Sequence, residues 1–142
     1  MWDRGSILRV WLPLVAFLYG TYAVFVLGPG PRDALRWLGL ALCLIGESGV
    51  IVARATLGRS FSVRAKATEL VTTGIYSRIR NPIYLSGLIF ITGIILIVRK
   101  PVVAVLLVVI IPMQIIRARR EAAVLEAKFG DAYREYRSRT WF

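Results

Sequence analysis

The chain has 142 residues, of which 57% are hydrophobic, and its formal net charge is +11. The apolar residues come in blocks, with the basic residues between and after them. This pattern excludes an ordinary soluble domain and favours a membrane protein that contacts anionic lipid rather than nucleic acid. The chain has no histidine and one cysteine, Cys43, which excludes histidine-based catalysis and a disulfide framework and argues against a zinc or haem site.

The sequence predicts an all-α integral membrane fold with four transmembrane helices in a single domain, residues 1–142. The first apolar segment is longer than the apolar core of a signal peptide and ends in a Gly/Pro turn, so we expect a retained span. Only Arg99 and Lys100 separate the last two segments, and Pro101 suits a first helical position, so these segments should form a tight helical hairpin. The predicted spans lie at about residues 10–27, 35–56, 82–98 and 101–116.

The basic residues predict how the chain is threaded through the membrane. Fourteen of them lie in the N-terminal tail, the 57–81 connection and the C-terminal tail, whereas four lie in the two opposite loops. Because cytoplasmic loops carry the excess of Lys and Arg, we expect both termini and the 57–81 connection in the cytoplasm.

The C-terminal tail, residues 117–138, is predicted to be helical and amphipathic. Its apolar side chains recur at steps of three and four, so they share one helix face, and the basic residues on the other faces would lie against lipid head groups. Gly130 should interrupt this helix, with Asp131 capping a last short helix. The apolar face consists of Ala118, Ala122, Leu125, Phe129, Tyr133 and Tyr136.

Residues 70–87, LVTTGIYSRIRNPIYLSG, differ from both the apolar segments and the charged tail. Asn81 is a good N-cap and Pro82 a good first helical residue, so this pair is predicted to begin the third span at the cytoplasmic surface. Taken alone, the pair is a structural signal, and Tyr84, one turn later, would ordinarily be an aromatic residue of the membrane interface.

Three charged residues in or beside the spans each have two possible roles. Arg117 and Glu121 are four residues apart on one helix face, so they form either a surface ion pair or part of a site. Glu47 lies inside the second span, where a carboxylate costs roughly 2.5–3.5 kcal/mol on insertion scales and should face the protein interior or a cavity. Its role is either a hydrogen bond between packed helices or direct contact with a substrate.

The predicted hairpin brings these signals together. Residues 70–87 lead into its first helix, and Arg117 and Glu121 follow its second, so both groups should lie at the cytoplasmic end. Backbone amides, hydroxyls, aromatic rings, arginines and a carboxylate are therefore expected to converge on one pocket at the membrane face.

The stretch LVTTGIYSRIRNPIYLSG, followed by RARREAAVLEAKFGDAYREY, resembles the isoprenylcysteine carboxyl methyltransferase family and its phospholipid methyltransferase relatives. The resemblance implies an integral-membrane methyltransferase that uses S-adenosyl-L-methionine without the Rossmann fold of soluble methyltransferases. By position, Arg117 and Glu121 would face the methyl acceptor. Glu47, in a Gly-Glu pair similar to the family's, is a third catalytic candidate. The resemblance implies a cofactor pocket lined by Leu70, Val71, Tyr76, Arg80, Asn81, Pro82 and Tyr84.

The chain departs from the eukaryotic pattern of that family at two positions. Asn81 and Thr68 stand where the pattern has histidine, and the loop between Phe61 and Leu70 is shorter. Asn81 can still donate or accept a hydrogen bond, so this change is compatible with cofactor binding. These departures and the four predicted spans favour a prokaryotic homologue in the inner membrane.

The methyl acceptor is expected to be a lipophilic small molecule or lipid that reaches the pocket from the bilayer. An isoprenylcysteine-like carboxylate could be held bidentately by Arg117, whereas a lipid amine could give its proton to Glu121 or Glu47. Two other functions also fit the hydropathy. They are a non-catalytic four-helix membrane protein and a sterol-reductase-like membrane protein that binds a nicotinamide cofactor. The sequence does not indicate an oligomeric state.

Overall fold

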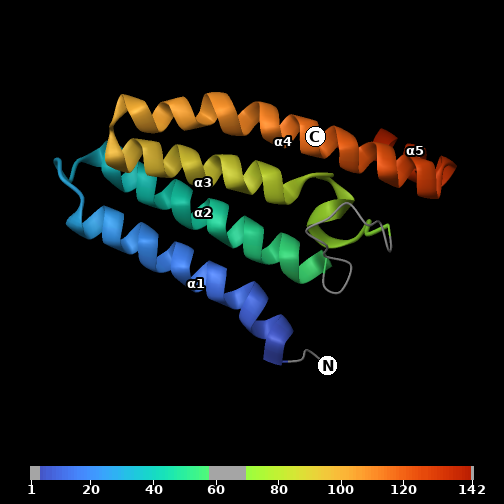
Figure 1. Ribbon diagram of the computed structural model, residues 1–142, viewed down its shortest axis with the longest axis horizontal. Helices are drawn as coiled ribbons and strands as arrows, with labels where there is room; N and C mark the ends of the chain where they lie inside the picture. Colours follow the sequence, from blue (N-terminus) through green and yellow to red (C-terminus); the bar gives the residue numbers. More distant parts are fainter. Residues whose placement is uncertain (1–3, 58–69, 142) are drawn as a thin grey trace.

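The computed structural model describes residues 4–57 and 70–141, with side chains from residue 15 onward. The regular secondary structure of this part of the chain is helical, apart from one isolated bridge between Ile79 and Trp141. In Figure 1 the long helices lie side by side, and the last short helix lies at the far end of the helix before it. The elements are α1 (Arg4–Leu27), α2 (Ala34–Leu57), the 3-10 turn η2 (Gly74–Ser77), α3 (Pro82–Val98), α4 (Pro101–Phe129) and α5 (Asp131–Arg139).

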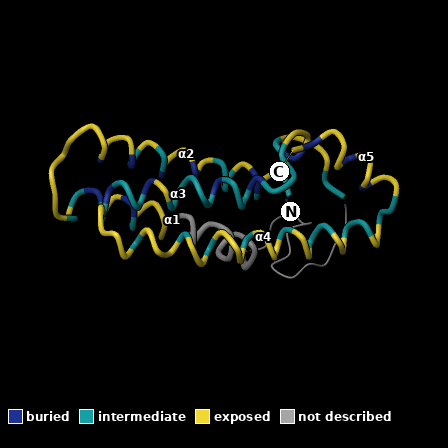
Figure 2. The backbone as a smooth tube through the Cα atoms, turned by 90° about the horizontal axis from the view of Figure 1, so that it is seen from above, coloured by how far each residue is buried: buried dark blue, intermediate teal, exposed yellow. Residues whose placement is uncertain are grey.

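Two of these helices, α2 and α4, are long and apolar enough to cross a membrane. The part of α1 whose side chains are described, Val15–Leu27, and the whole of α3 are shorter apolar helices, so four spans remain a prediction. None of the side chains of α4 is buried, and Figure 2 shows exposed and half-buried positions along its whole length. Exposed apolar side chains on this scale are typical of a surface that contacts lipid or another apolar partner.

The predicted helix boundaries hold at α3 and at the start of α4, and the first part of the predicted helical tail is continuous with α4 rather than a separate helix. The helix continues without a break to Phe129, so the predicted tail begins as part of α4. The physical reason is that residues 117–129 contain mostly Ala, Arg, Glu, Leu and Lys, which are good helix formers, and no breaker stands before Gly130.

One glycine makes the turn between α4 and α5. Gly130 has a φ of 50°, and its N–H donates to the carbonyl oxygen of Glu126 over 2.9 Å, which ends α4. The same residue is the N-cap of α5, so the prediction that Asp131 would cap this helix is wrong, and Asp131 is its first residue. A left-handed conformation is easiest for glycine, which explains why the chain reverses here and the cap moves by one position.

Small residues allow α2 and α3 to touch through their backbones. A Cβ atom added to Gly93 would lie 2.5 Å from the carbonyl oxygen of Gly39, and one added to Gly46 would lie 2.6 Å from that of Ser86. Cys43 lies between these contacts and is fully buried, as expected for a small apolar residue. Contacts of this kind bring membrane helices close without a hydrophobic driving force.

The end of the bundle opposite the predicted cytoplasmic side is held together by a buried arginine. Arg36 is only 1% exposed, and its guanidinium donates to carbonyl oxygens at the end of α1 and in the following turn, including those of Phe25 at 2.5 Å and Gly28 at 2.8 Å. The carboxylate of Asp33 accepts a hydrogen bond from the backbone N–H of Arg36 over 3.1 Å and pairs with Arg99 at the end of α3. Arg36 therefore satisfies the last carbonyls of α1.

We expect Gly93→Ala to destabilise the bundle by about 1–3 kcal/mol, because the added methyl group would meet the backbone of α2 and force the helices apart. Thermal unfolding in detergent, followed by circular dichroism, measures the change. The matched control is Gly20→Ala on α1, where an added Cβ meets nothing within 4 Å. Equal melting temperatures for the two variants would contradict this account of α2 and α3.

Candidate functional site

The segment before α3 follows a tight path against α2. Gly74 has a φ of 58°, and a Cβ added to it would lie 3.0 Å from the side chain of Thr56 on α2. Glycine is therefore favoured both by the backbone conformation and by the close approach. Gly74 is the first residue of η2, in which Tyr76 is buried, whereas Leu70 and Val71, which precede η2, are half-buried.

The C-terminus returns to this segment and pairs with it. The Tyr136 hydroxyl donates to the carbonyl oxygen of Tyr76 over 2.8 Å in a buried position. The backbone N–H of Trp141 donates to the carbonyl oxygen of Arg78 over 3.0 Å, and the N–H of Arg80 donates back to Trp141 over 3.4 Å. These bonds hold α5 against residues 76–80, a contact that the sequence did not predict.

Burial of the tyrosines in this region keeps their hydroxyl groups protonated. It raises the pKa of Tyr136 to about 12 and raises the pKa of Tyr76 and Tyr133 above the ordinary value for tyrosine. For Tyr76 the nearby Glu121 carboxylate adds to the effect. Each of these hydroxyls is therefore a hydrogen-bond donor at neutral pH.

The start of α3 is joined to α4 by one direct side-chain bond. The Tyr84 hydroxyl donates to Oε2 of Glu121 over 3.0 Å, and the guanidinium of Arg117 lies 6.0 Å from the centre of the Tyr84 ring. The expected proximity of residues 70–87 to Arg117 and Glu121 is thus confirmed for Tyr84. The salt bridges among the described residues do not include an Arg117–Glu121 pair.

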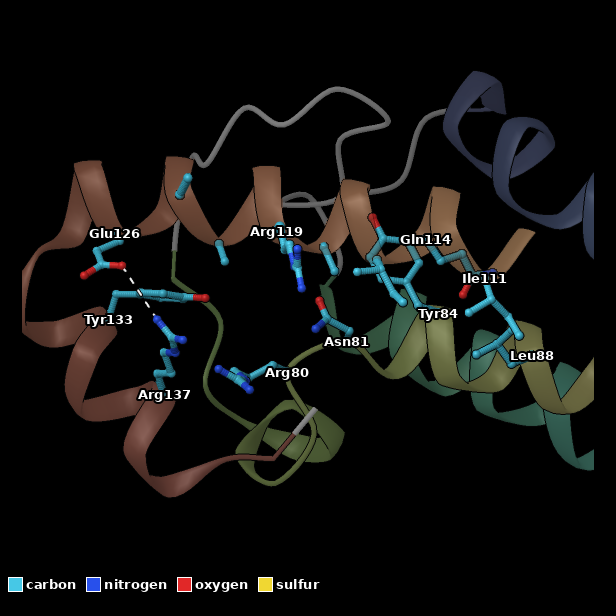
Figure 3. A pocket seen from close by; sticks show the side chains of 14 residues that line it. Arg80, Asn81, Tyr84, Leu88, Ile111, Gln114, Arg119, Glu126, Tyr133 and Arg137 are labelled. Carbon is cyan, nitrogen blue, oxygen red and sulfur yellow. Dashed lines mark ion pairs between the residues drawn. The ribbon is translucent and has the colours of Figure 1, made fainter. Parts of the chain in front are cut away.

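A cavity of about 500 Å³ lies between the start of α3, the middle of α4 and α5 (Figure 3). Its wall is apolar toward the predicted membrane interior, at Leu88, Ile111 and Ile115, and charged toward α5. On α4 the lining residues recur at steps of three and four, and alanines between the larger side chains leave the space open. The lining residues are Arg80, Asn81, Tyr84, Leu88, Ile111, Gln114, Ile115, Ala118, Arg119, Ala122, Ala123, Glu126, Tyr133 and Arg137.

Three of the predicted cofactor residues, Arg80, Asn81 and Tyr84, line this cavity. Asn81 and Pro82 do begin α3 as predicted, but the Asn81 side chain makes no capping hydrogen bond. The other predicted cofactor residues do not line the cavity; they are Leu70, Val71, Tyr76 and Pro82. Arg117 and Glu121 do not line it either, but both contact Tyr84, which does. Thr68 and residues 58–69 of the predicted cofactor segment lie outside the described residues.

Glu47 lies away from this cavity. It is 4% exposed on α2, and neither of its carboxylate oxygens has a hydrogen-bond partner within the described ranges. Of the two roles that the sequence leaves open for Glu47, the hydrogen bond between packed helices is thus not formed among the described residues, and contact with a substrate stays a prediction.

Sequence reasoning missed five of the polar or aromatic lining residues as site residues: Gln114, Arg119, Glu126, Tyr133 and Arg137. A signal was present for one of them, because Gln114 is the only amide side chain in the apolar segment 101–116. The described ranges hold no group of three or more Cys, Asp or Glu side chains that could bind a metal ion.

Comparison with known proteins gives one family match. A family model described as phospholipid methyltransferase matches residues 34–132, which is more than half of the chain. The nickel-cobalt-cadmium resistance protein NccN of Alcaligenes xylosoxydans xylosoxydans is 40% identical over 62 residues, covering 41% of this chain and 28% of NccN. The chain thus spans little more than a quarter of that relative, and no solved structure matches it significantly.

We expect Tyr136→Phe to loosen the contact between α5 and η2, because the buried carbonyl oxygen of Tyr76 would lose its donor. A buried acceptor left unpaired costs about 1–3 kcal/mol, so amide hydrogen exchange of residues 74–81 should become faster. The control is Tyr22→Phe, at an exposed position of α1. Unchanged protection of residues 74–81 in Tyr136→Phe would argue against this role for the hydroxyl.

Proposed function

The chain belongs to the phospholipid methyltransferase family, and on that premise we propose that it is an integral-membrane methyltransferase that depends on S-adenosyl-L-methionine. It moves a methyl group to a lipophilic acceptor at the cytoplasmic face of a prokaryotic inner membrane. The observation that carries the proposal is the hydrogen bond between Tyr84 and Glu121. It joins residues 81–84, Asn-Pro-Ile-Tyr, which resemble the family's motif, to α4. The bond lies beside a cavity that is apolar on one side and charged on the other.

The residues around the cavity fit this cofactor. Its volume of about 500 Å³ is in the range of small-molecule sites. The rings of Tyr84 and Tyr133 and the carboxylate of Glu126 suit a cationic sulfur, and Arg80 and Arg119 suit a carboxylate. Buried Nε of Arg80 has no hydrogen-bond partner in the described part of the chain, as expected of a donor that a ligand would engage.

We assign direct cofactor contact to Arg80, Asn81 and Tyr84, with buried Tyr76 and Pro82 supporting them from behind. When bound, S-adenosyl-L-methionine supplies an electrophilic methyl group on a positively charged sulfur. Methyl transfer needs orientation of the two reactants more than acid–base chemistry, so a rigid wall is the main contribution of the protein. The hydrogen bond from Tyr84 to Glu121 fixes the ring that forms part of this wall.

The acceptor side of the proposed site consists of Arg117, Glu121 and the apolar end of the cavity. Leu88, Ile111 and Ile115 are suited to a hydrocarbon chain. Arg117 is suited to a carboxylate acceptor, whereas Glu121 could receive the proton of an amine. Glu47 stays a candidate for a role elsewhere along the path of the acceptor.

The length of α4 supports a site at the membrane surface. Its 29 residues extend about 43 Å at roughly 1.5 Å per residue, which exceeds a hydrocarbon core of about 30 Å. If α4 starts at the opposite surface, its last turns project into the cytoplasm together with the basic residues that flank the cavity. The excess of basic residues on this side favours the same orientation, with both termini in the cytoplasm.

Purified protein in detergent should bind S-adenosyl-L-methionine and show a rise in melting temperature at millimolar concentration. NADPH, the cofactor expected of a sterol-reductase-like protein, should produce no comparable shift. Stabilisation by NADPH alone would support that alternative, and a folded protein that binds neither compound would support a non-catalytic membrane protein.

Glu121→Ala should reduce methyl transfer to an amine acceptor at least about 100-fold, because the acceptor loses its base. Binding of S-adenosyl-L-methionine should change little. Transfer of labelled methyl groups into a total membrane lipid extract measures the first quantity, and equilibrium binding measures the second.

The matched control is Glu135→Ala on α5, whose carboxylate is 71% exposed and pairs with Arg139. Transfer should be unaffected by this change. Full activity in Glu121→Ala would show that the role given to Glu121 is wrong.

A further inference from the structure

Gln114 is a polar side chain in the apolar part of α4, three residues before Arg117. Its carboxamide oxygen, Oε1, is buried and has no hydrogen-bond partner among the described residues. Buried amide groups are normally paired, since leaving one unpaired in apolar surroundings is unfavourable. An unpaired amide in a cavity wall therefore points to a ligand that supplies the missing partner.

Gln114 lines the cavity together with Tyr84 near the start of α3 and with the apolar side chains of Ile111 and Leu88 (Figure 3). Gly87 of α3 lies close to this amide, since a Cβ atom added to Gly87 would lie 3.7 Å from Nε2 of Gln114. That distance is an ordinary van der Waals contact, so Gln114 packs beside α3 at this position.

The chemistry of the surrounding wall defines what Gln114 adds. The Tyr84 hydroxyl is already engaged by Glu121, and the unpaired Nε of Arg80 is a donor. The apolar wall can hold only hydrocarbon. Gln114 thus offers an uncharged hydrogen-bond acceptor at the depth where a lipid chain would give way to its head group.

We propose that Gln114 selects the methyl acceptor: its carboxamide oxygen accepts a hydrogen bond from an N–H or O–H group on the head of the acceptor molecule. A carboxylate at neutral pH has no such hydrogen, so this contact favours amine or hydroxyl acceptors over carboxylates. The inference rests on the proposed function and deepens it. Gln114 acts as a specificity residue and makes or breaks no covalent bond.

The test compares two probes with labelled S-adenosyl-L-methionine and protein in detergent. Dioleoylphosphatidylethanolamine carries N–H donors, and N-acetyl-S-farnesylcysteine carries a carboxylate. The wild type should methylate the first in preference to the second. Gln114→Met keeps the length of the side chain without its amide and should raise KM for phosphatidylethanolamine roughly threefold to tenfold, the loss of one hydrogen bond, with cofactor affinity unchanged.

A conservative variant separates a contact with the acceptor from a structural role. Gln114→Glu keeps an accepting oxygen, so its KM for phosphatidylethanolamine should stay near the wild-type value. Met113→Leu is the matched control, since Met113 is the adjacent residue, is 56% exposed and does not line the cavity. Its KM should equal that of the wild type.

Four results would overturn the inference: an unchanged KM in Gln114→Met, equal impairment of the Met and Glu variants, preference of the wild type for the carboxylate probe, or transfer to neither probe while the cofactor binds. Failure of the wild type to bind S-adenosyl-L-methionine is a different result, because it removes the proposed function and this inference with it.

Discussion

Direct contact between the backbones of α2 and α3 is the constraint on which the rest of the structure depends. Gly39 and Gly93 approach so closely that neither position accepts even a methyl group without movement, and Gly46 meets Ser86 in the same way farther along. Such a seam allows little rotation or sliding of one helix on the other. It therefore determines the height and direction at which α3 begins, and Tyr84 is placed with it.

The site is completed by elements that are packed less tightly. α4 has no buried residues, and a cavity lies between it and the start of α3. Specific polar contacts hold it there, above all the bond between Tyr84 and Glu121. The C-terminus adds a second set through Tyr136 and Trp141. A rigid pair of helices combined with a less tightly packed wall held by polar contacts suits the proposed site, which would admit a lipophilic acceptor.

Basic residues have different tasks at the two ends of the bundle. Arg36 is buried and donates hydrogen bonds to the carbonyl oxygens that end α1, so this arginine stabilises the fold. At the other end Arg80, Arg119 and Arg137 line a cavity, where Arg137 pairs with Glu126. A count of basic residues per loop predicts the orientation of the chain in the membrane, but it gives all of these arginines the same weight.

The amino-acid sequence by itself determined the helical class, the start of α3 at Asn81-Pro82, the hairpin with α4 and the proximity of residues 70–87 to Glu121. These features follow from hydropathy, local helix signals and short connections, which act between neighbouring residues. Only the tertiary structure decided that Gln114 and Tyr133 line the cavity while Glu47 does not. Which face of a helix meets a cavity depends on how it is rotated against its neighbours. Contacts between distant residues set that rotation, and no local pattern records it.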